Sequence, residues 1–314
     1  MLTKLNPLFL ERLKEIYSRE EFEKITPSFL IEKRKTSFRI NSLNGTEKEV
    51  EKELNNAHII FQKLSFPKNS YILKNAKEKE LWSLECYKQG KIYIQSLSSQ
   101  IPVHYMELKE GQKVADIAAA PGGKTSQIAE YVGKTGEVIA TEIQKIRSEK
   151  LEYNMKKLNC ENVSFLNIDA KKLNEQFEEA YFDALLFDAP CSGEGNINIH
   201  NEKSFSEWSE THIKRNYQRQ KEIIDKTLPL LKSGGIFLYS TCTLAPEENE
   251  AIVHYILCNH KDLEIQDLEI PLKNIKAGIK KFKKYIYTSG VEKSLRILPN
   301  EQMEGFFIAK FKKI

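Results

Sequence analysis

The chain has 314 residues and a mass of 36.4 kDa, which allows one large or two ordinary domains with a buried core. Its composition, 40% hydrophobic and 29% charged, is that of a soluble globular protein. No apolar run approaches the ~20 residues that a membrane span requires, so we expect no membrane partner. The formal net charge of +4 favours an anionic partner only mildly.

The cysteines are few and odd in number, at positions 86, 160, 191, 242 and 258. Such a set argues against a disulfide framework, and the absence of CxxC and HxxxH spacings argues against a zinc site. The first residues, "MLTKLNPLFLERLKEIY", lack the uninterrupted apolar core of a signal peptide. We therefore expect a cytoplasmic protein without a bound metal.

The first hundred residues predict a separate α+β unit. Helical patterns cover residues 8–24 and 46–56, and short β-like runs occur at "SFRIN", "HIIFQ" and "YIL". A more regular pattern begins after "GKIYIQSLSSQIPVHYMEL". We place the domain boundary there, with residues 1–105 as the N-terminal domain and residues 106–314 as the second.

From Lys113 onward, strands and helices alternate. Strands are predicted at 113–118, 137–142, 163–169, 181–188 and 236–242, and helices at 124–132, 143–158, 212–231 and 245–257. In the last helix, Pro246 and the acidic residues should form the first turn. The end of the chain, "RILPN…GFFIAKF", predicts a closing hairpin. Alternation of this kind gives an α/β fold with a doubly wound, mostly parallel sheet, which binds ligands at the carboxyl ends of its strands.

The segment "DIAAAPGGKTSQ" (116–127) resembles a phosphate-binding loop but does not complete one. A Walker-type loop needs a glycine where Ala118 stands. As a strand-to-helix turn, however, Gly122 and Gly123 allow close approach of a ligand, and the helix N-terminus favours an anionic group.

Acids follow the next three strands, at Glu142, Asp169 and Asp188. They would form a polar rim around a nucleoside, with Glu142 suited to the ribose. The alternative is that they are helix caps or solvated loop residues. A nucleoside ligand that carries a carboxylate and no phosphate is S-adenosylmethionine.

Two cysteines lie in polar loops: Cys191 in "FDAPCSGEG" and Cys242 in "YSTCTLAPEE". Methyl transfer to a pyrimidine C5 carbon needs a thiolate that adds to C6, because C5 is otherwise too electron-poor to attack. An acid such as Asp188 could assist at N3 of cytosine. We expect the thiolate loop to be partly exposed and electropositive, with helix N-termini after both motifs. The alternative is that the cysteines are small buried residues, which is our expectation for Cys86, Cys160 and Cys258.

These motifs resemble the Sun/Fmu-type RNA cytosine-5 methyltransferases over nearly the whole chain. "FRINSLN" is similar to the signature of the family's N-terminal RNA-binding region, and "IQSLSSQ" to the segment before the cofactor domain. "AAAPGGKT", "DAPCSGEG", "STCTLAPEENE" and "RILPNEQMEGFFIAKF" follow in the family's order. The resemblance implies a Rossmann-like class I methyltransferase domain with a mostly parallel seven-stranded sheet, and a smaller α+β RNA-binding domain before it.

The resemblance also implies roles for individual residues. Cys242 would be the nucleophile, and Cys191 would assist release of the methylated base. Asp188 would lie near the transferred methyl group and the target base, as would Lys124. The cofactor S-adenosylmethionine would contact Ala118, Ala119, Ala120, Pro121, Gly122, Gly123, Lys124, Glu142 at the ribose, Arg147 beside that acid, Asp169 at the adenine, and Asp188.

A lysine-rich segment predicts RNA binding. Residues 272–296 interleave lysines at 273, 276, 280, 281, 283 and 284 with Phe282, Tyr285 and Tyr287, which could meet phosphates and stack on bases. "EKRKTSFR" is a second basic cluster. An ordinary solvated basic face is the alternative. The target base must leave its stack to reach a thiol.

The favoured function is an RNA cytosine-5 methyltransferase acting as a monomer on rRNA or tRNA. A P-loop nucleotide hydrolase is disfavoured by Ala118 and gives the cysteines no role. A non-catalytic, RNA-binding ribosome assembly factor on the same fold is the other alternative.

Overall fold

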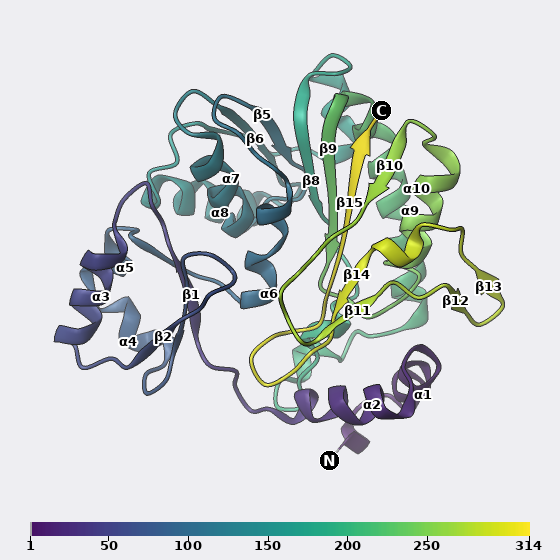
Figure 1. The fold of residues 1–314 in the computed structure, drawn as a ribbon, viewed down its shortest axis with the longest axis horizontal. Helices are drawn as coiled ribbons and strands as arrows, with labels where there is room; N and C mark the ends of the chain where they lie inside the picture. The colour runs from purple at the N-terminus through teal and green to yellow at the C-terminus, as the bar shows by residue number, and fades with distance from the viewer. Residues whose placement is uncertain (1) are drawn as a thin grey trace. The chain divides into compact units, whose positions relative to one another are not determined.

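The computed structural model describes residues 2–314, which form two compact units (Figure 1). Unit 1 consists of the residues up to Arg34, Ala189–Asp225 and Tyr239–Ile314, and unit 2 of Lys35–Asp188 and Lys226–Leu238. Strand β9 (Leu231–Thr241) has residues in both. The predicted boundary at residue 105 stays a prediction. Between residues 2 and 314, no helix combines the length and the apolar character that a bilayer crossing requires.

The parallel strands of unit 2 confirm the predicted alternation of strands and helices. In the order β8-β5-β6-β7 each strand pairs with the next in parallel, and Ala115 lies opposite both Ile139 and Leu185. Consecutive residues of these strands, such as Val114 with Ala115 and Ala184 with Leu185, are all buried, so both faces of the sheet are covered, as parallel strands require. The bounds are β5 (Lys113–Asp116), β6 (Glu137–Thr141), β7 (Val163–Leu166) and β8 (Phe182–Asp188).

Helices α7 (Gly123–Val132) and α8 (Lys145–Lys157) connect these strands. The helix predicted at 143–158 is present, but only some of its apolar side chains are buried. Leu151 and Met155 are buried, whereas Ile143 and Ile146 are 45% and 71% exposed. The reason is that α8 begins at Lys145, so Ile143 precedes it and Ile146 lies in its open first turn.

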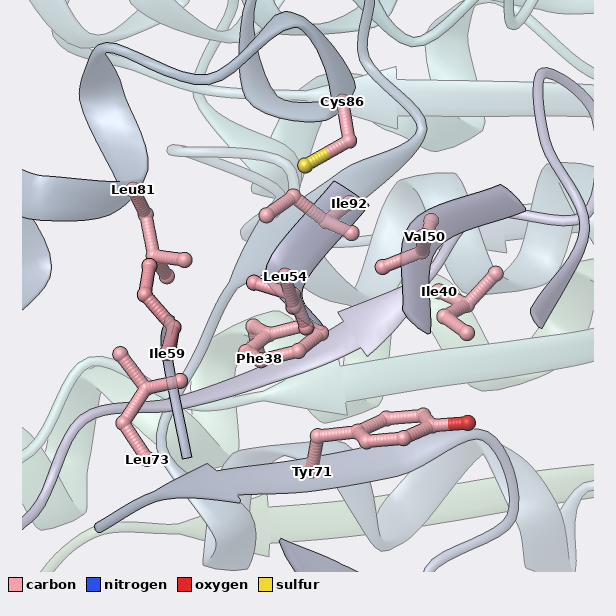
Figure 2. Close-up of a cluster of buried hydrophobic side chains, with 10 residues drawn as sticks. All are labelled: Phe38, Ile40, Val50, Leu54, Ile59, Tyr71, Leu73, Leu81, Cys86 and Ile92. Atoms are coloured by element: carbon pink, nitrogen blue, oxygen red, sulfur yellow. The ribbon is translucent and has the colours of Figure 1, made fainter. Parts of the chain in front are cut away.

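Unit 2 also contains a four-stranded antiparallel sheet in the order β2-β3-β1-β4. It packs with short helices around a cluster of buried side chains that includes Phe38, Tyr71 and Cys86 (Figure 2). The predicted strand at 58–62 starts later, at Phe61. The bounds are β1 (Ser37–Ile40), α3 (Glu47–Asn56), β2 (Phe61–Lys63), β3 (Ser70–Leu73), α4 (Glu78–Trp82), α5 (Glu85–Lys88), β4 (Ile92–Ile94) and α6 (Leu97–Gln100).

Unit 1 begins with α1 (Pro7–Ile16) and α2 (Arg19–Ile25), where the sequence predicts one helix over 8–24. The chain breaks at Ser18, because its side chain accepts a hydrogen bond from the Glu21 amide and the Glu21 carboxylate accepts one from the Ser18 amide. This capping box starts a new helix.

The rest of unit 1 holds the predicted C-terminal hairpin, in which β14 pairs antiparallel with β15. Strands β10 and β11 pair with β15 and β14, so the mixed sheet has nine strands instead of the predicted seven. The remaining bounds are α9 (Glu210–Thr227), α10 (Glu250–Asn259), β10 (Leu263–Gln266), β11 (Ile275–Ala277), β12 (Lys281–Phe282), β13 (Tyr285–Ile286), β14 (Leu295–Ile297) and β15 (Phe306–Lys313).

Candidate active site

Two thiols lie side by side in unit 1. Cys191 is in the loop after β8, Cys242 directly follows β9, and their Sγ atoms are 3.3 Å apart. Both side chains are half-buried and neither is in a disulfide. We call the two segments that carry them, Pro190–Gly195 and Cys242–Asn249, the thiol loops. Cys86 and Cys160 are buried as expected, but the expectation of a buried Cys258 is wrong, because it lies on an open face of α10.

Main-chain hydrogen bonds join the thiol loops. The amide of Gly195 donates to the carbonyl of Cys242 at 2.9 Å, and the amide of Gly305 donates to the carbonyl of Gly195 at 3.1 Å. A Cβ atom at Gly195 would lie 2.1 Å from the Gly305 carbonyl oxygen and 2.8 Å from that of Cys242. Only glycine therefore allows this approach.

A buried carboxyl group links both thiol loops through their side chains. Glu248 accepts hydrogen bonds from the Ser192 amide, at 3.0 Å to Oε1, and from the Ser192 hydroxyl. The same hydroxyl lies 2.7 Å from Thr243 Oγ1. Burial raises the pKa of Glu248 to about 8, although its hydrogen bonds with Ser192 oppose the shift.

The surroundings of Cys191 differ from the electropositive loop that the sequence predicts. Its hydrogen bond with Cys242, its burial and the nearby Glu248 hold the pKa of Cys191 well above its usual value. A three-residue 3₁₀ turn, η5 (Glu194–Asn196), follows this thiol in place of the expected helix. Cys191 is therefore a neutral thiol in this state, and the expectation of an electropositive site is wrong for it.

The second expected helix N-terminus also lies elsewhere. Helix α10 begins at Glu250, so Pro246 and the acids after it form a turn before the helix. Glu247 pairs with Arg12, and the Asn249 side chain exchanges hydrogen bonds with Thr241 and the Thr243 carbonyl. These contacts fix residues 246–249 outside the helix.

In unit 2, Ala118–Gly123 forms the strand-to-helix turn that the sequence predicts, here called the glycine loop. Gly122 has a φ of +103°, and a Cβ atom at Gly123 would lie 2.9 Å from Gln95 Nε2. The loop lines a cavity of about 260 Å³. The lining is formed by Tyr93, Ile94, Gln95, Ser99, Asp116, Ala118, Ala119, Ala120, Pro121, Gly123, Lys124 and Asp188.

Three ionisable side chains, Lys124, Asp188 and Asp116, line this cavity. Lys124 Nζ is 2.6 Å from Asp188 Oδ2, and the lysine is only 8% exposed. Asp116 accepts a hydrogen bond from the Thr125 hydroxyl at 2.7 Å, while its other oxygen is buried without a hydrogen-bond partner. Burial raises the pKa of Asp116 to about 7. The cavity therefore combines a cation, a carboxylate and an unsatisfied acceptor.

Arg147 joins the acid after β6 to the glycine loop. Its guanidinium lies 3.2 Å from Glu142 Oε2 and donates a hydrogen bond of 2.7 Å to the Ala120 carbonyl. Asp169 instead caps η4 (Ala170–Glu175), because its carboxylate accepts from the Lys171 amide at 3.0 Å. For Asp169, the structure thus shows the helix-cap contact that we set out as the alternative. Throughout residues 2–314, no group of three or more His, Cys, Asp or Glu side chains could hold a metal ion.

This arrangement agrees with comparisons to known proteins. Residues 103–312 match the family model described as 16S rRNA methyltransferase RsmB/F. A tRNA (cytosine(49)-C(5))-methyltransferase of Pyrococcus abyssi is 31% identical over 311 residues, which cover 99% of this chain and 97% of that protein. The chain belongs to the RsmB/F methyltransferase family.

Two further RsmB/F relatives come from Pyrococcus horikoshii. Its tRNA (cytosine(72)-C(5))-methyltransferase is 35% identical over 243 residues, which cover 77% of this chain but only 57% of that protein. A crystal structure described as a methyltransferase homolog protein has a TM-score of 0.79 and 30% identity, and covers 99% of this chain and all of that one. The predicted resemblance and the Rossmann-like fold class are confirmed.

Sequence reasoning missed two functional candidates in this RsmB/F chain. Glu248 was assigned to a helix turn, although the double acid in "PEENE" after a cysteine motif was a usable signal. Arg39 was counted in a basic surface cluster, yet it is 2% exposed and donates to the Gly123 carbonyl and the Ser126 hydroxyl. Asn41 of the same signature is also buried, and it donates to the Gly90 and Leu158 carbonyls.

The lysine-rich segment has fewer exposed aromatic rings and unpaired lysines for RNA contacts than its sequence suggests. Phe282 and Tyr287 are buried, so Tyr285 is the exposed aromatic ring of the three. The ammonium groups of Lys276, Lys280 and Lys283 pair with nearby glutamates. The prediction of three stacking aromatics is wrong, because Phe282 and Tyr287 are packed inside the protein.

Proposed function

We propose that this protein is an S-adenosylmethionine-dependent RNA cytosine-5 methyltransferase in which Cys242 is the nucleophile and Cys191 assists product release. The observation that carries this proposal is the pair of thiols on adjacent loops, with Sγ atoms 3.3 Å apart. Methyl transfer to nitrogen or oxygen needs no thiol, whereas C5 of a pyrimidine needs one to form the C6 adduct.

The surroundings of Cys191 suit it to the task of a proton-bearing neighbour of the nucleophile. Cys191 keeps its proton because its pKa is raised, so it can donate a hydrogen bond to a Cys242 thiolate. The Cys242 thiolate forms a bond to C6 of the target base, and C5 then takes the methyl group, with S-adenosylhomocysteine as the leaving group. Loss of the C5 proton to a base and breakage of the Cys242–C6 bond release the product, with Cys191 as the group beside the leaving sulfur.

The cavity in unit 2 fits the methionine end of the cofactor. Its lining has the close backbone approach of the glycine loop, the Lys124 cation and the unsatisfied Asp116 oxygen. When bound, S-adenosylmethionine supplies an electrophilic methyl group. Glu142, held by Arg147, binds the ribose, and Asp169 lies at the adenine. Asp188 holds Lys124 and comes three residues before Cys191, which links the cofactor loop to a thiol loop along the chain.

RNA is the proposed substrate, either tRNA or rRNA. The P. abyssi relative that matches along its whole length acts, by its name, on cytosine 49 of tRNA, whereas the family description names 16S rRNA. The chain spans less than two thirds of the P. horikoshii tRNA (cytosine(72)-C(5))-methyltransferase. We therefore give tRNA as the first substrate to test and small-subunit rRNA as the second, with the protein acting as a cytoplasmic monomer.

The test is methyl transfer from labelled S-adenosylmethionine to unmodified tRNA and small-subunit rRNA. Wild type, Cys242→Ala and Cys191→Ala are compared, with Cys258→Ala as the control for an exposed thiol outside the loops. We expect label in cytosine with wild type and the control, none with Cys242→Ala, and a covalent RNA–protein adduct with Cys191→Ala. Bisulfite sequencing then identifies the nucleotide. Cofactor binding without methylation of any RNA would instead favour the assembly factor.

A further inference from the structure

The mechanism above leaves Glu248 without a role, although its side chain is hydrogen-bonded to the Cys191 loop at both the amide and the hydroxyl of Ser192. Its carboxyl group accepts two hydrogen bonds from the main-chain amide and hydroxyl of Ser192, the residue next to Cys191. Gln220 from α9 donates to the Pro190 carbonyl at 3.0 Å and lies 3.4 Å from Glu248 Oε1. Both residues that flank Cys191 are therefore held by one buried network.

The same network reaches the Cys242 loop. The Ser192 hydroxyl lies 2.7 Å from Thr243 Oγ1, next to Cys242. The main chain of Glu248 is fixed as well, since the Tyr239 hydroxyl donates to its carbonyl at 2.6 Å. Glu248 is fully buried. The carboxyl group is therefore connected, through Ser192 and Thr243, to the residues next to both thiols. A displacement of Glu248 should displace the thiols with it.

We propose that Glu248 is a positioning residue for product release: acting through Ser192, it holds the Cys191 thiol against the leaving sulfur of Cys242. This inference rests on the proposed function. Glu248 does not line the cavity at the glycine loop, so its loss should misplace Cys191 while the methyl transfer itself continues. The covalent adduct should then persist, as we expect when Cys191 is removed.

The charge on Glu248 would also act on Cys191. The titratable groups around it are the two thiols of the loops, Glu194 of η5 and Tyr239 of β9, while α9 contributes the neutral amides of Asn216 and Gln220. With a pKa of about 8, Glu248 is mostly protonated at neutral pH. Above that pH its negative charge holds the proton on Cys191 more firmly and disfavours the negative charge that develops on the Cys242 sulfur as the Cys242–C6 bond breaks, so release should slow.

The experiment separates the first turnover from release. Wild type, Glu248→Ala, Glu248→Gln and the control Glu264→Gln, an exposed acid on β10, are mixed with RNA and labelled S-adenosylmethionine. Methyl transfer in a single turnover, the amount of denaturant-stable RNA–protein adduct and the steady-state rate are measured from pH 6.5 to 9.

For Glu248→Ala we expect a first turnover like that of wild type, an accumulated adduct and a steady-state rate lower by about tenfold or more. Glu248→Gln keeps the shape and the hydrogen bonds of the protonated acid. It should release product normally at pH 7 and lose the decline that wild type shows above about pH 8.

Wild-type release by Glu248→Ala, or a decline near pH 8 that persists in Glu248→Gln, would overturn the inference. If the Glu248→Ala variant does not fold, the pH dependence of product release in Glu248→Gln tests the inference. A wild-type protein that methylates no RNA would contradict the proposed function instead, before any variant is compared.

Discussion

Asp116 and Glu248 are acids whose surroundings favour the protonated form, and each is adjacent to a charged or reactive neighbour. The sequence predicted the two thiols, Lys124 and Asp188 as site residues, because their motifs lie at strand ends where a parallel sheet collects side chains, but it did not predict the ion pair between Lys124 and Asp188. It did not predict Glu248, since which of two consecutive glutamates turns inward depends on the turn at residues 246–249. Arg39 was missed for a related reason. Its position in a strand does not indicate that its side chain contacts the glycine loop, which is distant in the sequence.

Replacement of Asp116 by asparagine should change the pH dependence of stability. The pKa is about 7 in the folded protein against 3.8 ordinarily, so the folded state holds a proton that the unfolded chain has lost between these values. Wild type should therefore lose stability relative to Asp116→Asn as pH rises from about 4 to 7, by up to about 1.4 kcal/mol per pH unit.

Urea unfolding at pH 5, 6, 7 and 8 measures this difference. Asp267→Asn, at an exposed carboxylate paired with Lys293, serves as the control. Parallel stability curves for wild type and Asp116→Asn across this range would contradict the prediction.

The strands were predictable because each is a short apolar run bounded by turn residues, and β5, β6 and β8 appear where their runs do. Helix starts were less predictable. The sequence predicts Pro246 in the first turn of a helix, but α10 begins only at Glu250, because Glu247 pairs with the distant Arg12 and Asn249 bonds to Thr241 and Thr243. The start of α10 thus depends in part on a contact between residues far apart in the chain, which a local sequence pattern cannot predict.

Gly195 and Gly193 of one thiol loop should respond very differently to alanine. Gly193 has a φ of +71° and open space around its missing Cβ, so Gly193→Ala should cost only about 1 kcal/mol. At Gly195 the new Cβ would collide with the carbonyl oxygens of Gly305 and Cys242, which would have to move.

We therefore expect Gly195→Ala to lower methyl transfer by about a hundredfold, since the Cys242 main chain is displaced. Labelled methyl transfer and thermal unfolding of both variants test this. Equal activity of the two variants would show that the loop tolerates the displacement.

The lysine-rich segment predicted an RNA partner. The structure reduces the number of its side chains that are exposed and available to contact RNA. Lysines and aromatics were counted equally in the sequence, yet burial removes Phe282 and Tyr287, and ion pairs engage several lysines. Exposed Lys281 and Lys284 remain beside the exposed Tyr285 of hairpin β12–β13. Such pairing cannot be deduced from composition, because two of the acids involved, Glu21 and Glu210, lie far away in the chain.

Alanine at Lys281 and Lys284 together should weaken RNA binding and flatten its salt dependence. Each lysine that contacts a phosphate contributes roughly 0.7 to 0.9 to the slope of log K against log salt. Lys24→Ala, whose ammonium pairs with Glu20 on α2, is the control for charge alone. Filter binding of tRNA between 50 and 200 mM salt, about the range where phosphate contacts dominate, measures the slopes. An unchanged slope in the double variant would place the RNA contacts elsewhere.

The protons on the two buried acids, Asp116 and Glu248, raise the net charge of the folded protein. The formal charge of +4 counts every aspartate and glutamate as ionised. With pKa values of about 8 and about 7, Glu248 and Asp116 retain much of their protons at pH 7, which makes the net charge about +5. In an electric field the native protein should migrate as a more cationic species than its residue count gives, and unfolding should release those protons to the buffer.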